Sequence, residues 1–91
     1  MAGGFMSASQ EEKQRVLEMI KPLISEKLNM KHCSDCFKVV SHEVQVVAGV
    51  NHKLRIQVSD SECIHVKAFE SLDGEFTIQQ LLEGKSLDET F

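Results

Sequence analysis

Cysteine and histidine are the residue types of this chain that could support metal, redox or nucleophilic chemistry. Two of the three cysteines form the motif Cys33-Ser34-Asp35-Cys36, a C-x-x-C spacing typical of zinc sites and redox-active disulfides. A structural zinc site needs four ligands, and only Cys63 and the histidines are left to complete it. A redox motif is expected at a helix N-terminus, whereas this one follows a predicted helix. We interpret these cysteines as ordinary thiols, with a metal or redox site as the alternative.

Cys63 and His65 form a second candidate pair, because positions two apart on a strand point to the same face. A nucleophile and its base need this proximity, but the sequence shows neither a group to orient the histidine nor an oxyanion hole. The other histidines, His32, His42 and His52, lie at scattered positions, and we expect them at the surface. No phosphate-binding loop, paired-carboxylate site or dinucleotide fingerprint is present. The sequence therefore predicts a protein that is not an enzyme and uses no metal or cofactor.

The pentapeptide Gln45-Val46-Val47-Ala48-Gly49 interrupts a β-rich stretch with two small residues. It contains no nucleophile, acid, base or metal ligand, and Gly49 permits a turn with positive φ. A tip of this composition can enter a narrow cleft and present apolar surface and backbone groups. It favours a binding function over a catalytic one.

Length and charge limit the kind of partner. The 91 residues fit a single domain spanning 1–91, in which 1–7 form a flexible N-terminal arm. The net charge is −4, and residues 59–91 hold eight acidic and two basic side chains. Nucleic acids and anionic membranes need a basic footprint, so neither is an expected partner.

The expected location follows from the N-terminus and the cysteines. Residues 1–5 have neither the charged leader nor the apolar run of a signal peptide. No apolar stretch approaches the roughly 20 residues of a membrane span. An odd number of cysteines does not suit a disulfide framework. We expect a reduced, cytoplasmic protein, which would reach the outside only by a non-classical route.

One amphipathic helix is predicted over residues 9–29. Ser9 and Glu12 have the spacing of a capping box. An apolar stripe at helical spacing follows: Val16, Leu17, Met19, Ile20, Leu23, Ile24 and Leu28. Pro22 should bend the helix without ending it, because the stripe continues in phase beyond the proline.

Four alternating segments after the helix predict strands. The positions assigned to one face are Lys38, Val40, His42, Val44, Val46 and Ala48, then Leu54, Ile56 and Val58, then Ile64, Val66 and Ala68, and last Phe76, Ile78, Gln80 and Leu82. Short connections make the strands antiparallel, so the fold class is α+β, with one long helix on a curved sheet of four to five strands. Hairpins near 48–51 and 72–74 can then lie at the same end of the sheet.

These features together resemble the stefins, the intracellular type-1 cystatins that inhibit papain-like cysteine peptidases. The resemblance covers nearly the whole chain: a glycine near the start, the helix end 21–27, the motif 45–51, the segment 65–72 and the C-terminal 87–91. It implies the cystatin fold, one long helix wrapped by a five-stranded antiparallel sheet whose first strand is the short arm.

The resemblance also implies a contact set. In stefins, the N-terminal glycine, here Gly3 or Gly4 with Gly4 favoured, occupies the non-primed side of the peptidase cleft. The Gln45–Gly49 hairpin covers the catalytic cysteine, and Leu72-Asp73-Gly74 packs on the primed side. Stefins often have Leu-Pro where this chain has Leu72-Asp73, so Asp73 adds a charge.

The partners so implied are papain-like cysteine peptidases such as cathepsins, inhibited reversibly, tightly and competitively. The alternative is a non-inhibitory interaction domain of cystatin fold. We expect a monomer, and a dimer that swaps the 45–51 hairpin is the other arrangement to consider.

Overall fold

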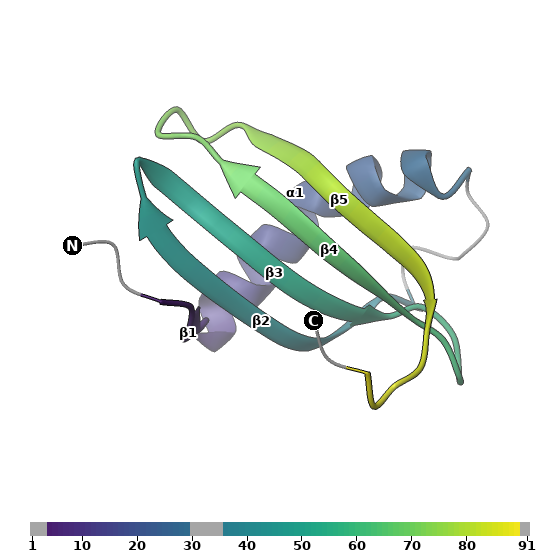
Figure 1. The fold of residues 1–91 in the computed structure, drawn as a ribbon. Coiled ribbons are helices and arrows are strands. Elements are labelled where there is room, and N and C mark those ends of the chain that lie inside the picture. Colours follow the sequence, from purple (N-terminus) through teal and green to yellow (C-terminus); the bar gives the residue numbers. More distant parts are fainter. Residues whose placement is uncertain (1–3, 30–35, 90–91) are drawn as a thin grey trace.

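The computed structural model describes residues 4–29 and 36–89. Its elements are β1 (Met6–Ser7), α1 (Gln10–Lys27), β2 (Lys38–Val47), β3 (Gly49–Gln57), β4 (Cys63–Glu70) and β5 (Phe76–Lys85). The strands form one antiparallel sheet in the order β1-β2-β3-β4-β5, and α1 crosses one face of it (Figure 1). This confirms the predicted α+β class, with the arm as first strand.

The helix begins and ends close to its predicted limits. Ser9 is the N-cap, and its side-chain oxygen accepts a hydrogen bond from the Glu12 amide at 3.2 Å. The helix runs through Pro22 without interruption to Lys27. Asn29, with a φ of 54°, follows its end, as is common after a helix C-cap.

The core lies between α1 and the face of the sheet that the helix covers. It is formed by Val16, Ile20, Ile24, Leu28, Phe37, Leu54, Ile56, Val58, Ile64, Val66 and Ala68. The helical members recur every fourth residue, which keeps them on one narrow face. Met19 was predicted to lie in this stripe but is 48% exposed, so that prediction was wrong: the buried stripe is narrower than the sequence suggested.

A β-bulge in β2 overturns part of the predicted strand pattern. Val39 pairs with Ile56 and Ser41 with Arg55, so Val40 is an extra residue without a partner on β3. Val39 therefore packs against the core, and Val40 is 41% exposed. The predicted core position of Val40 was wrong because one inserted residue shifts the alternation by one.

A second bulge changes β5 in the same way. The register moves from Ala68–Ile78 to Lys67–Gln80, which leaves Gln79 as the extra residue. Leu81 packs against the core in place of the predicted Gln80 and Leu82, both of which are exposed. Bulges bend and twist a sheet locally, and this one lies on the edge strand that borders the helix.

The face of the sheet opposite the helix has a smaller buried patch. Cys63 and His65 lie on this face, as predicted from their spacing, and both are buried. The chain after β5 turns back, and the Arg55 guanidinium donates a hydrogen bond to the Glu89 carbonyl at 2.8 Å. The C-terminal segment thus closes over this patch.

Candidate functional site

Three segments meet at one end of the sheet. They are the arm (residues 4–7), the first hairpin (residues 45–51) and the second hairpin (residues 71–75). Because β2 to β5 form an antiparallel meander, the β2–β3 and β4–β5 connections fall at the same end, and β1 of the arm pairs with the edge of β2 (Figure 1). The prediction that the two hairpins share an end is confirmed. We name these three segments together the loop end.

The first hairpin is ordered up to its tip. Val47 pairs with Gly49, which leaves Ala48 alone at the turn. Behind the tip, the Asn51 side-chain amide donates a hydrogen bond to the Gln45 side-chain oxygen at 3.1 Å. The valine side chains of the motif and Ala48 are exposed. The hairpin therefore presents small apolar groups on a rigid two-stranded frame.

Gly49 meets two separate requirements. Its φ is +116°, a conformation that L-residues rarely adopt. In addition, a Cβ atom at this position would lie 2.5 Å from Phe69 Cζ and 2.7 Å from the Glu70 carbonyl oxygen. The tip of the first hairpin therefore rests directly on β4, close to where the second hairpin begins.

The second hairpin is closed by hydrogen bonds of its own. The Ser71 amide donates to the Glu75 carbonyl at 2.8 Å, and the Gly74 amide donates to the Ser71 carbonyl at 2.9 Å. The Ser71 hydroxyl accepts from the Glu75 amide at 3.1 Å. Leu72 is 85% exposed at the turn, and Asp73 is exposed beside it. This loop offers one large apolar side chain next to a negative charge.

The arm lies along the edge of β2. Met6 and Ser7 pair with β2 in antiparallel register, which directs Phe5 and Gly4 toward the first hairpin. The Lys53 ammonium lies 4.1 Å from the centroid of the Phe5 ring, a cation–π contact that holds the arm to the sheet. Gly4 is exposed, with open space around it. Gly3 lies outside the described residues.

A buried polar chain behind the loop end was missed by the sequence analysis. His42 and His52 were expected at the surface, but they are only 2% and 1% exposed, so that expectation was wrong. His42 Nε2 lies 2.9 Å from His52 Nδ1, and His52 Nε2 lies 3.0 Å from Glu70 Oε1. Arg15 of α1 donates to both Glu70 carboxylate oxygens, at 3.0 and 3.1 Å. His32 lies outside the described residues.

The electrostatics of this polar chain follow from burial and pairing. Hydrogen bonds from Arg15 hold the pKa of Glu70 below its usual value, against the opposing effect of desolvation. Loss of hydration, reinforced by His52, lowers the pKa of His42 to about 4. One signal could have revealed this burial: His52 shares the alternation of Leu54 and Ile56, which are both core residues.

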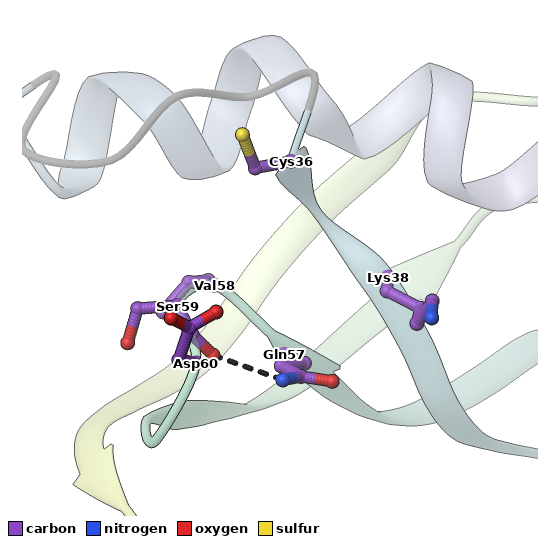
Figure 2. Close-up of a pocket in the computed structure, with 6 residues that line it drawn as sticks. All are labelled: Cys36, Lys38, Gln57, Val58, Ser59 and Asp60. Atoms are coloured by element: carbon purple, nitrogen blue, oxygen red, sulfur yellow. Dashed lines mark hydrogen bonds between the residues drawn. The ribbon is translucent and has the colours of Figure 1, made fainter.

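The thiols are not part of the loop end. Cys36 is exposed in an open hollow of about 380 Å³ at the other end of β2 and β3, and Figure 2 shows it apart from Lys38 and Gln57. Cys33, its partner in the C-x-x-C motif, lies outside the described residues. Within 4–29 and 36–89, no cluster of three or more histidine, cysteine or acidic side chains could hold a metal ion. In the same ranges, no helix is long and apolar enough to cross a membrane.

Known proteins share this chain's sequence pattern. The family model for the cystatin domain matches residues 3–88. Cystatin-A of Felis catus is 35% identical over 81 residues, which cover 86% of this chain and 81% of the relative. Cystatin-B of Pan troglodytes is 37% identical over 78 residues, covering 82% and 78%. Stefin-C of Bos taurus is 36% identical over 75 residues, covering 80% and 72%.

The match extends over nearly the whole chain, and the fold agrees with it. Cystatins inhibit cysteine peptidases and are not enzymes, which confirms the prediction that this chain has no catalytic role. The predicted resemblance to stefins is likewise confirmed. The chain belongs to the cystatin family of cysteine peptidase inhibitors.

Proposed function

We propose that this chain is a reversible, tight-binding, competitive inhibitor of papain-like cysteine peptidases, with cathepsins as the target class. The arm, the first hairpin and the second hairpin together fill the active-site cleft. The proposed contact residues are Gly3, Gly4, Gln45, Val46, Val47, Ala48, Gly49, Leu72, Asp73 and Gly74. The observation that carries the proposal is that two ordered hairpins and the arm converge on one end of the sheet.

The shape of the loop end accounts for blocking without cleavage. A papain-like site cuts a chain that lies extended through the cleft with a carbonyl against the thiolate. The first hairpin turns back at Ala48, held by the Gln45–Asn51 hydrogen bond, so it enters the cleft as a closed tip. Such a tip excludes substrate and offers no extended peptide for attack.

Order in the free state favours tight binding. Both hairpins are closed by internal hydrogen bonds, so little conformational entropy is lost there on binding. Leu72 and Val46 are already exposed and available for apolar contact. An interface of standard size, roughly 1,600 Å² in total, can reach high affinity when such contacts are well packed.

The first experiment is a titration of papain activity with this protein, read with a small fluorogenic substrate. Stoichiometric, reversible loss of activity supports the proposal. Gly49→Arg should abolish inhibition, because a long side chain would have to displace Phe69 or the tip itself. No inhibition by the folded wild-type monomer would refute the proposal and favour the interaction-domain alternative.

Location and assembly belong to the same proposal. We place the protein in the cytoplasm, because its odd number of cysteines does not suit the disulfide framework of a secreted domain. The inhibitory form is a monomer, because exchanging β strands at residues 45–51 would open the first hairpin and remove the tip.

A further inference from the structure

The buried polar chain joins four elements behind the loop end. His42 comes from β2, His52 from β3, Glu70 from β4 and Arg15 from α1. The strands β2 and β3 carry the first hairpin, and Glu70 is the residue directly before Ser71, where the second hairpin begins. One contact, between His52 and Glu70, therefore links the two hairpins through side chains.

The hydrogen-bond partners fix the tautomer of each histidine when both imidazoles are neutral. Glu70 accepts, so His52 carries its proton on Nε2 and leaves Nδ1 as an acceptor. His42 then carries its proton on Nε2 and donates it to His52 Nδ1. His42 Nδ1 is buried and has no hydrogen-bond partner among the described residues. Every other imidazole nitrogen of the pair is satisfied.

The pair can accept one proton without losing either hydrogen bond of His52, although the bond between the two imidazoles reverses its direction. A proton on His52 Nδ1 makes that nitrogen a donor, and His42 accepts it on Nε2 after its own proton moves to Nδ1. The new charge lies 3.0 Å from the Glu70 carboxylate, which is already charge-paired with Arg15. The three contacts of the polar chain all persist in this state.

A second proton cannot be taken up without losing the hydrogen bond between His42 and His52. With both ring nitrogens of His42 and of His52 protonated, two donors face each other across 2.9 Å. The other charges that face His42 all come from α1, namely Glu12, Lys13 and Arg15, and their sum is positive. From β5, the uncharged Phe76 ring approaches, with its centroid 5.7 Å from that of His52. The hydrogen bond between β2 and β3 side chains is then lost, and repulsion between the two imidazoles takes its place.

We propose that Arg15, Glu70, His52 and His42 position the two hairpins relative to one another, and that this link survives one proton but is broken by a second. The four are positioning residues, because they act through the hairpins and lie behind the proposed contact surface. The consequence for affinity rests on the proposed inhibitory function, whereas the consequence for hairpin structure does not.

Heteronuclear NMR of the full chain between about pH 7.5 and about pH 3.5 tests the link directly. It follows the ring nitrogens of both histidines and the amides of Gly49 and Gly74, one in each hairpin. We expect both amides to shift together with the second protonation of the pair, at about pH 4. Amides that move independently of the ring nitrogens, or a response in one hairpin only, would overturn the proposal.

His42→Gln is the decisive variant. Its side-chain amide can still donate to His52 Nδ1, but it cannot take up a proton. The acid transition of both glycine amides should disappear in this variant and persist in His65→Gln, the matched control. His65 is as buried as His42 but lies on the opposite face of the sheet. An unchanged transition in His42→Gln would overturn the proposal, and His42→Phe provides a second test if the glutamine variant does not fold.

Papain inhibition assays test the consequence of this link for affinity. The ratio of wild-type to His42→Gln inhibition constants cancels the pH dependence of the peptidase itself. This ratio should be flat from pH 7 down to mildly acidic pH and should rise about twofold at the pH where half of the free protein holds the second proton. A flat ratio throughout would refute the link to affinity. Absence of inhibition at neutral pH would instead refute the proposed function, and the amide titration would still decide the structural proposal.

Discussion

The ring of Phe69 lies directly against Gly49, so that the neighbouring strand β4 supports the tip of the first hairpin. A side chain at position 49 would meet both this ring and the Glu70 backbone. The glycine of the motif is therefore needed for contact with β4 as well as for its positive φ.

Replacing Gly49 by alanine should thus cost more than replacing a glycine that only has a positive φ. Gly84 is the matched control, since its φ is +70° and nothing lies within 4 Å of the position that a Cβ atom would occupy. We expect Gly84→Ala to lower the free energy of unfolding by about 1 kcal/mol from backbone strain alone. Gly49→Ala should lower it further and weaken papain inhibition by at least about tenfold, which corresponds to about 1.4 kcal/mol.

Urea unfolding and papain titration of both variants check this prediction. Equal destabilisation in the two would show that Phe69 moves aside freely. Loss of inhibition in Gly84→Ala would place its cause outside the loop end, because Gly84 lies at the opposite end of β5 from the second hairpin.

Leu72 should contribute to binding and not to folding. Its side chain is 85% exposed, so Leu72→Ala should change the free energy of unfolding by no more than about 0.5 kcal/mol. If it fills an apolar site on the peptidase, the same change should raise the inhibition constant roughly tenfold. Val40→Ala is the control, an exposed apolar residue on β2 away from the loop end, and should leave inhibition unaltered. Equal inhibition by both variants would remove Leu72 from the contact set.

Stability should fall in acid because of His42. Its pKa is lowered to about 4 in the folded protein, chiefly by desolvation, from an ordinary value near 6.5. The unfolded chain therefore binds this proton more readily, and stability is lost as the pH falls from about 6.5 to about 4. The lowered pKa of Glu70 acts in the same direction, because folding favours its ionised form.

Protonation of His42 should lower the free energy of unfolding by about 2–3 kcal/mol when the pH has fallen to about 4. Urea unfolding of the wild type and of His42→Gln at neutral and mildly acidic pH measures it as the difference in pH dependence. Parallel pH profiles for the two proteins would show that His42 does not account for the loss.

The described thiols should differ in reactivity. Cys36 is exposed, whereas Cys63 is buried and its pKa is raised by desolvation, so little thiolate is present at neutral pH. Iodoacetamide labelling followed by peptide mass spectrometry should modify Cys36 well before Cys63. In denaturant the difference should vanish. Rapid labelling of Cys63 in the native protein would mean that the C-terminal segment opens readily.

The local elements could be predicted because their signals lie within a few residues. The Ser9 cap, the i, i+4 stripe through Val16 and Ile20, and the turn residues at Gly49 and Gly74 each act over one turn or one hairpin. The meander then follows from short connections, and with it the meeting of the two hairpins at one end. Ala48 and Leu72, predicted at the two hairpin tips, are exposed there, as expected of residues in short turns.

Only the tertiary structure showed whether a residue is buried when its environment depends on a neighbouring strand or on the helix. The bulges after Val39 and at Gln79 reverse the alternation, and no residue type in either strand marks an insertion. The burial of His42 and His52 depends on Glu70 and Arg15, which lie on other elements and make burial of the imidazoles tolerable. Alternation along a strand is a one-dimensional pattern, whereas a bulge or a paired buried charge is settled only when the partner strand and the helix are in place.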